Sequence, residues 1–380
     1  MAKQITKRTL VGYSGAKLNA HYFDDLVNQI KNKSDKFIDR ITRESYWRKG
    51  GKNIMDFDAI VGNPPYQEMD GGFNASSTPI YNYFVETAVA LNPNTLSMIM
   101  PARWYIGGRG LDKFRASFLP DHHVSLLVDF PQDKDVFDNV DIAGGVCYFR
   151  RDRNYNGPCK IVNRSSSSED ISDSRYLDEF DTLVRDNKAI DIVRQVINKH
   201  EGSYLDTVVS PSRPFGLRTN YKPHDRGIPC QFTQRKGKQF ADPKDVTDKS
   251  NILDKWKFLA PKAPIAGQTD FTKPVGFYYS GNTFITEPGC CCTESFIVLY
   301  AADSKDEIES FRSYLFTKTV RFLLLQSVIS QDVISDKFRF VPHLGHYEGI
   351  YTDEQLRKMW DISDEQWQYI DSRITDVSNK

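Results

Sequence analysis

The chain has 380 residues, of which 39% are hydrophobic and 26% are charged, and its 50 basic and 50 acidic residues give a formal net charge of zero. This length allows two or three domains with sizeable cores, and the composition is that of an ordinary globular protein. No run of about 18 apolar residues occurs and the first residues lack the apolar core of a signal peptide, so we expect no contact with a membrane.

The first 155 residues alternate between short apolar segments and amphipathic ones. A polar, helix-leaning region covers 1–52, and the predicted strands that follow are 57–62, 96–100, 124–130 and 145–149. The predicted helices between them are 80–91 and 111–119. Near-continuous apolar strands alternating with helices indicate an α/β sheet covered on both faces. The last two strands lie too close together for a crossover helix, which fits an antiparallel pair at one edge of the sheet.

The character of the sequence changes after residue 151. The pattern predicts a helix over 177–197, an irregular, partly β region over about 205–274, a strand at 296–300 and a long helix over 308–328. Thr352 and Ser363 have the sequence context of residues that cap the last two helices. We therefore expect five segments: 1–52, an N-terminal helical region; 53–155, a catalytic part; 156–204, a linker and helix; 205–345, a recognition domain; and 346–380, C-terminal helices.

Cysteine and histidine spacing gives no metal signature. The six cysteines include three consecutive ones at 290–292, which is not a zinc spacing, and adjacent cysteines are awkward disulfide partners. The histidines show no ligand spacing with them. We expect reduced thiols, a cytoplasmic protein and no metal site.

Charge is unevenly distributed although the total is zero. Between Arg213 and Lys262 the sequence has twelve Lys or Arg and five Asp, a local net charge of +7, interleaved with six aromatic residues. Basic and aromatic residues together suit phosphate contact and base readout on double-stranded DNA. The alternative is a small domain whose core consists of those aromatic side chains. The candidate DNA contacts are Arg213, Arg218, Arg235 and Lys236.

The tetrapeptide Asn63-Pro64-Pro65-Tyr66 directly follows the first predicted strand. Ligands of such sheets bind beyond the carboxyl ends of the strands, where this tetrapeptide lies. The Asn63 side-chain oxygen and the Pro64 carbonyl could both accept hydrogen bonds from one amino group, because Pro65 cannot continue regular structure. Tyr66 could stack on a base that has been flipped out of a duplex. These four residues are the catalytic candidates, and direct displacement would depend chiefly on positioning.

Residues 55–67, which contain this tetrapeptide, resemble motif IV of the adenine-N6 DNA methyltransferases, and the Eco57I-like methylases of restriction-modification systems are the most similar group. The resemblance covers roughly 55–150. It implies a Rossmann-like methyltransferase sheet, complete or incomplete, followed by an α+β DNA-recognition domain. It also implies methyl transfer from S-adenosylmethionine to adenine N6 in a restriction-modification or phage-defence context. Phe137 is a candidate for a second base-stacking residue, and a core role for it is an equal alternative.

The sequence departs from this family where the cofactor would bind. Members carry a glycine-rich turn well over fifty residues before the tetrapeptide, and only 62 residues precede Asn63 here. The best imitation of that turn contains Gly12 and Gly15, with too little chain for three βα units. We therefore expect one of three situations: a cofactor half on a separate chain, a truncated relative of a longer methylase, or a degenerate methylase that kept DNA or base recognition.

Two other functions fit the same tetrapeptide. Enzymes that methylate a glutamine amide of release factors use it, but they are compact, whereas some 230 residues follow the catalytic part here. A DNA-binding or assembly subunit without its own cofactor site is the non-enzyme alternative. The expected partners are double-stranded DNA and either a second methylase or restriction subunit or a second copy of the chain.

Overall fold

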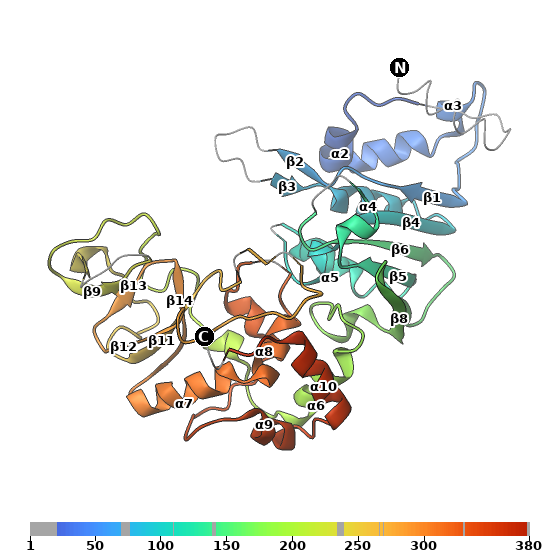
Figure 1. Ribbon diagram of the computed structural model, residues 1–380. Coiled ribbons are helices and arrows are strands. Elements are labelled where there is room, and N and C mark those ends of the chain that lie inside the picture. Colours follow the sequence, from blue (N-terminus) through green and yellow to red (C-terminus); the bar gives the residue numbers. More distant parts are fainter. Residues whose placement is uncertain are drawn as a thin grey trace. The chain divides into compact units, whose positions relative to one another are not determined.

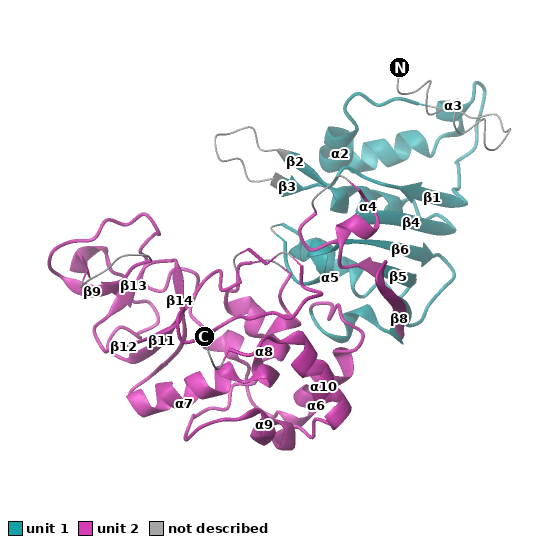
Figure 2. Cartoon of the chain, viewed as in Figure 1, with its two compact units in different colours: residues 1–128, 146–161, 174–181 teal, residues 129–145, 162–173, 182–380 magenta. Residues whose placement is uncertain are grey.

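The computed structural model describes residues 21–69, 77–108, 110–138, 142–233, 239–265, 267–268, 270–329 and 331–377 (Figure 1). The chain divides into two compact units, coloured separately in Figure 2. Unit 1 comprises 1–128, 146–161 and 174–181, and unit 2 comprises 129–145, 162–173 and 182–380. The five predicted segments do not coincide with these units, and their functional labels stay a prediction.

One six-stranded sheet has the strand order β1-β4-β6-β5-β7-β8. Its strands are β1 (Ala59–Gly62), β4 (Thr95–Pro101), β5 (Val124–Phe130), β6 (Val146–Asp152), β7 (Cys159–Ser165) and β8 (Ser168–Arg175). β1 and β4 are parallel, with Val61 opposite Ser97, whereas β4 and β6 are antiparallel. Parallel neighbours need a crossover, and helix α4 (Tyr81–Ala90) lies between β1 and β4 in the chain. The predicted α/β class is confirmed.

One expectation about this sheet is wrong. β5 and β6 are neighbours, but they are not at an edge, because β7 and β8 continue the sheet beyond β5. The predicted cover on both faces is incomplete among the described residues. Val61 on β1 is 78% exposed, and Ser97 and Ile99 on the same face of β4 are half-buried, whereas Leu96 and Met100 on the opposite face are 0% exposed.

In unit 1, helix α4 packs against β4, and helix α2 (Leu26–Ile41) packs against α4. Helix α2 buries Ile30, Phe37 and Ile41, and partly buried side chains of α4 pack against this cluster. A short hairpin of β2 (Gln67–Met69) and β3 (Ser77–Pro79) follows the end of β1. Helices α3 (Glu44–Trp47) and α5 (Asp112–Phe118) complete this unit.

Unit 2 contains two three-stranded sheets, ordered β10-β9-β13 and β12-β11-β14. Their strands are β9 (Ile228–Gln231), β10 (Phe240–Ala241), β11 (Trp256–Pro261), β12 (Phe284–Thr286), β13 (Cys291–Cys292) and β14 (Phe296–Ala302). Phe215, Phe232 and Phe296 belong to one shared hydrophobic core. Several aromatic residues of the basic segment therefore form a core, which was the alternative explanation for them.

Helices make up the rest of unit 2. They are α6 (Ile190–Lys199), α7 (Lys305–Phe316), α8 (Lys318–Leu325), α9 (Asp353–Met359) and α10 (Asp364–Arg373). The long helix predicted over 308–328 is wrong, since Thr317 ends α7 and caps α8 by accepting a hydrogen bond from the Val320 amide. The helix predicted over 177–197 is also wrong in its first half, because α6 begins only at Ile190. The predicted caps at Thr352 and Ser363 are both confirmed as capping boxes.

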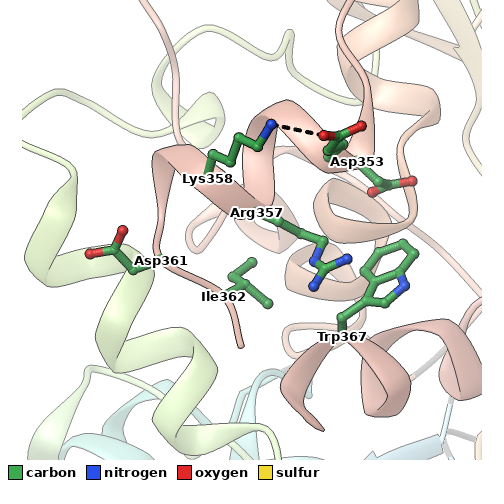
Figure 3. A pocket seen from close by; sticks show the side chains of 7 residues that line it. Asp353, Arg357, Lys358, Asp361, Ile362 and Trp367 are labelled. Atoms are coloured by element: carbon green, nitrogen blue, oxygen red, sulfur yellow. Dashed lines mark hydrogen bonds and ion pairs between the residues drawn. The ribbon is translucent and has the colours of Figure 1, made fainter. Parts of the chain in front are cut away.

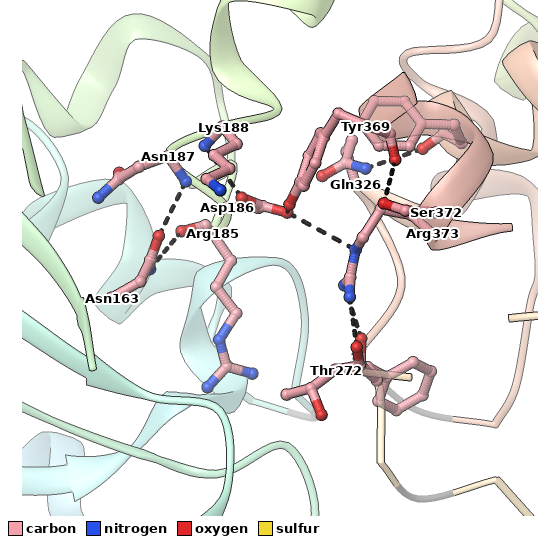
Figure 4. Close-up of polar contacts among 12 residues, drawn as sticks. Asn163, Arg185, Asp186, Asn187, Lys188, Thr272, Gln326, Tyr369, Ser372 and Arg373 are labelled. Atoms are coloured by element: carbon pink, nitrogen blue, oxygen red, sulfur yellow. Dashed lines mark hydrogen bonds and ion pairs between the residues drawn. The ribbon is translucent and has the colours of Figure 1, made fainter. Parts of the chain in front are cut away.

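Polar contacts hold α10 against loops of unit 2 (Figure 4). Asp186 accepts a hydrogen bond from the Tyr369 hydroxyl and lies 4.0 Å from the Arg373 guanidinium. The same guanidinium donates to the carbonyl oxygens of Thr272, at 2.6 Å, and Phe271, at 2.7 Å. The C-terminal helix is thus fixed by directional bonds as well as by apolar packing.

Candidate functional site

The tetrapeptide at 63–66 lies where the sequence predicts it, directly after the carboxyl end of β1. Asn63 is exposed and Pro64 is buried. Among the residues that the structure describes, neither the Asn63 amide nor the Pro64 carbonyl has a hydrogen-bond partner. Two acceptor oxygens of adjacent residues are therefore available for one ligand.

Tyr66 differs from Asn63 in being half-buried. Its backbone carbonyl accepts a hydrogen bond from the Ile80 amide at 3.2 Å, which joins the tetrapeptide to the start of α4. Its hydroxyl is buried and has no partner among the described residues. Burial, with a smaller contribution from nearby Cys147 on β6, raises the pKa of Tyr66 to about 12. The phenol of Tyr66 therefore keeps its proton well above neutral pH.

Phe137, the second stacking candidate, belongs to unit 2 and is half-buried. Its amide donates to the Asp133 carbonyl at 2.8 Å, and the Asp133 carboxylate in turn accepts from the Lys134 amide at 3.0 Å. These bonds fix the turn that carries Phe137. Whether its ring stacks on a base stays a prediction.

The cofactor candidates Gly12 and Gly15 lie outside the described residues. Within the described part of the chain, Gly50 and Gly51 are the glycine pair that precedes Asn63, and no helix follows them before β1. The glycine-rich strand-to-helix turn that S-adenosylmethionine would need is therefore absent from residues 21–69. The Asn63 and Pro64 oxygens could accept hydrogen bonds from one amino group, whereas residues 21–69 by themselves offer no such turn for the cofactor.

The structure separates the predicted DNA contacts. Arg235 and Lys236 lie outside the described residues. Arg218 is exposed and has no ion pair in the described part of unit 2. Arg213 is bound through its Nε to the Glu294 carboxylate at 3.0 Å. Glu294 was not predicted from the sequence, because nothing in a linear pattern brings together two residues so far apart.

One basic residue of the segment points inward. Lys257 is 0% exposed, and its ammonium donates to the carbonyl oxygens of Leu253, at 2.8 Å, Lys255, at 2.5 Å, and Glu287, at 3.3 Å. Burial lowers the pKa of Lys257. The basic surface is therefore smaller than the residue count suggests.

A hollow of about 730 Å³ on α9 and α10 is a second candidate for a ligand site (Figure 3). Its charged groups are paired: Arg357 with Asp364 at 2.5 Å and Lys358 with Glu354 at 2.8 Å. Arg357 also lies over the Trp367 ring, 5.2 Å from its centre. Such mutual pairing is typical of a structural surface, and we assign no ligand to it.

No three His, Cys, Asp or Glu side chains in the described ranges are placed so that they could hold a metal ion. None of the described helices is both long enough and apolar enough to span a bilayer.

The chain is similar to known methylases of restriction-modification systems over part of its length. The family model described as Eco57I restriction-modification methylase matches residues 1–137. An uncharacterized adenine-specific methylase of Mycoplasma pneumoniae is 30% identical over 167 residues, which are 38% of this chain and 40% of that protein. The chain thus spans less than half the length of that relative.

Two solved structures of restriction enzymes are also similar. The type IIG restriction endonuclease BpuSI has 11% identity and a TM-score of 0.29, over 80% of this chain and 50% of that one. The type IIL restriction-modification enzyme MmeI in complex with DNA has 10% identity and a TM-score of 0.38, over 74% and 45%. At these TM-scores the two structures carry no argument about this chain.

Proposed function

We propose that this chain is the target-binding and DNA-reading part of a DNA adenine-N6 methyltransferase, because its residues 1–137 match the family model described as Eco57I restriction-modification methylase. The observation that carries the proposal is the pair of acceptor oxygens on Asn63 and Pro64, at the carboxyl end of β1, which have no hydrogen-bond partner among the described residues. S-adenosylmethionine supplies the methyl group in this chemistry.

The lone pair of an exocyclic amino nitrogen is delocalised into the ring, so the nitrogen is a weak nucleophile. Two hydrogen bonds from its N–H groups, one to the Asn63 oxygen and one to the Pro64 carbonyl, would fix its orientation. The half-buried Tyr66 ring would hold the flipped base by stacking. No side chain with a shifted pKa near 7 is required, and positioning is the main contribution of this chain.

The free edge of β1 supports a proposal about the cofactor. β1 ends the strand order of the described sheet, and both Ala59 and Val61 on it are exposed. An unpaired apolar edge is a template for another strand, and ligands of α/β sheets bind where the strand order reverses. The cofactor-binding part would therefore pair with β1. It would be a further segment of the polypeptide, a second methylase or restriction subunit, or a second copy of the chain.

The first test is titration of the purified chain with S-adenosylmethionine, followed by assay of methyl transfer to adenine in duplex DNA. Asn63→Ala removes one of two positioning bonds and should reduce the rate by about 100-fold or more. The matched control is Asn94→Ala, an exposed asparagine next to the opposite end of β4, which should leave the rate unchanged.

The outcomes distinguish a self-sufficient methyltransferase from a split methylase or a DNA-binding subunit. Binding of the cofactor with methylation that depends on Asn63 supports a self-sufficient enzyme. No cofactor binding at millimolar concentration refutes self-sufficiency and favours a split methylase or a DNA-binding subunit. The missing cofactor turn in residues 21–69 agrees with both of these alternatives. Addition of the cofactor-binding partner would restore methylation only if the chain is half of a split enzyme.

A further inference from the structure

A cavity of about 330 Å³ in unit 2 is lined by segments that lie far apart in the sequence. Its walls present both hydrogen-bond donors and acceptors. The polar lining residues are Thr219, Thr233, Lys262, Glu294, Ser295 and Asp332. Phe296, from the hydrophobic core of this unit, forms part of its floor.

Backbone hydrogen bonds hold these segments in place. The Glu294 amide donates to the Leu217 carbonyl at 2.9 Å, and the Lys262 amide donates to the Ser295 carbonyl at 2.9 Å. The Val333 amide donates to the Lys262 carbonyl at 2.8 Å. The cavity is therefore preorganised, which recognition of a ligand edge requires.

Glu294 is the most strongly oriented side chain in the cavity. Its carboxylate accepts from the Thr219 amide at 3.3 Å and pairs with the Arg213 Nε at 3.0 Å. It remains 27% exposed, and a carboxylate offers about four acceptor sites, so it can still accept a bond from a ligand. The Nη groups of Arg213 have no partner in the described part of the chain, and the Arg213 side chain is 48% exposed.

Lys262 supplies the opposite charge. Its Nζ lies 4.0 Å from the Asp332 carboxylate, and the two side chains are 32% and 62% exposed. An exposed pair at this distance contributes little, so the ammonium can exchange it for a ligand acceptor. The two carboxylates would repel a phosphate, and the cavity therefore suits the edge of a base.

Exposed cations that could contact phosphates occur in the same unit. Arg218, Lys222, Arg226 and Lys249 are exposed and form no ion pair within the described residues. Phosphate contacts position a protein on DNA, whereas base contacts select the sequence. Unit 2 thus has two kinds of candidate DNA contact. The exposed cations suit the phosphates of the DNA backbone, and the cavity, which contains both charges, suits the edge of a base pair.

From these observations we infer that the cavity binds the major-groove edge of a G·C base pair. The Lys262 ammonium donates to guanine O6 and N7, and the Glu294 carboxylate accepts from the cytosine N4 amino group. The Ser295 hydroxyl donates to the Thr219 hydroxyl at 3.4 Å, and the Thr219 hydroxyl donates to the Glu294 carboxylate at 3.5 Å, so both hydroxyls help to orient Glu294. This inference rests on the proposed function, namely that the chain recognises double-stranded DNA, and it names the residues that determine part of the recognition sequence.

The test is selection of bound sequences from a random duplex library by the purified full chain, with sequencing of the bound fraction. The wild-type chain should enrich a motif with at least one fixed G·C position. Lys262→Gln and Glu294→Gln should each lower the preference for G·C at that position by about 10- to 100-fold and leave the other positions unchanged. Lys262→Gln is decisive, because Glu294→Gln also releases Arg213.

Arg218→Gln is the matched control. It removes one exposed cation without touching the cavity, so it should weaken binding to all sequences alike and reduce the salt dependence by about one unit of slope. Melting temperatures close to that of the wild-type chain would establish that all three variants are folded.

Each result decides the inference. Relaxation at one G·C position in both cavity variants supports it. An unchanged motif in both variants overturns it while DNA recognition stands, and relaxation at an A·T position overturns the assignment to G·C. Binding by the wild-type chain without any enriched motif also overturns it. Absence of DNA binding by the wild-type chain overturns DNA recognition by this chain, and the inference with it.

Discussion

The hydroxyl and the ring of Tyr66 should have opposite effects when they are removed. The hydroxyl is buried without a partner among the described residues, and such a group costs about 1–3 kcal/mol of stability. Tyr66→Phe should therefore stabilise unit 1 by about 1 kcal/mol, a rise in melting temperature of about 2–4 °C, and leave DNA binding intact. Tyr66→Ala should lose about 1–3 kcal/mol of stacking on a flipped base.

The assay compares affinities for a duplex in which 2-aminopurine replaces the target adenine, because its fluorescence rises on unstacking. Equal losses for Phe and Ala would show that the hydroxyl, and not the ring, contacts the base. The pH dependence offers an independent check. Since burial raises the pKa of Tyr66 from 10.0 to about 12, the unfolded chain loses this proton at a lower pH than the folded chain, and unit 1 should lose stability as the pH rises from 10 towards 12. Tyr66→Phe should remove this alkaline loss.

Three further changes test the packing of the chain. Lys257→Met should reduce the free energy of unfolding of unit 2 by about 3–5 kcal/mol in denaturant melts, because three backbone carbonyls would lose their buried donor. Asp353→Ala should cost about 1–2 kcal/mol, since this carboxylate accepts hydrogen bonds from the first two amides of α8. Burial tends to raise the pKa of Asp121, but the hydrogen bond and the charge of Arg151, together with hydrogen bonds from His123, outweigh burial and lower the pKa from its usual value of 3.8. The contribution of that pair to stability should be present above pH 3.8 and lost as the pH falls through the lower folded-state pKa, and Asp121→Asn should flatten this dependence.

Neighbouring residues provide controls for the first two of these changes. Lys255→Met removes a partly exposed lysine and Glu354→Ala removes an exposed carboxylate of α9, and each should change stability by no more than about 0.5 kcal/mol. A loss from Lys255→Met as large as that from Lys257→Met would refute the role given to the buried ammonium.

The sequence predicts those parts of the fold in which local pattern and tertiary environment agree. The strands at 59–62, 95–101 and 124–130 follow apolar runs, and the caps at Thr352 and Ser363 depend on residues three positions apart. Strand β8 was missed because it is a polar sequence with mostly exposed side chains, which suits the last strand of a sheet.

The helix predicted over 177–197 fails for a tertiary reason. Arg185 is held by the Asp129 carboxylate at 2.7 Å, and the Asn187 amide donates to the Asn163 side chain at 2.9 Å. These long-range bonds fix an irregular path before α6. In the break between α7 and α8, the Thr317 side chain offers the backbone a competing hydrogen bond that an apolar periodicity does not reveal.

The candidate sites likewise include residues that the sequence predicts and residues that only the fold reveals. The tetrapeptide at 63–66 can be predicted because its chemistry depends on consecutive residues. The pairing of Arg213 with Glu294 cannot, because only the fold brings these segments together. The number of basic residues likewise overstated the available positive surface, since Lys257 is buried.

The two units are interleaved in the sequence, and this limits which segments can be exchanged with related proteins by recombination. The chain passes between the units five times, and unit 2 becomes continuous only from residue 182 onward. A single recombination event at that point would import a new C-terminal part but leave the two unit 2 segments at 129–145 and 162–173 from the old parent. Chimaeras joined there should fold only when the two parents have compatible residues in these two segments. The evolution of new sequence specificity would therefore favour local replacements within 205–345 over exchange of a whole unit.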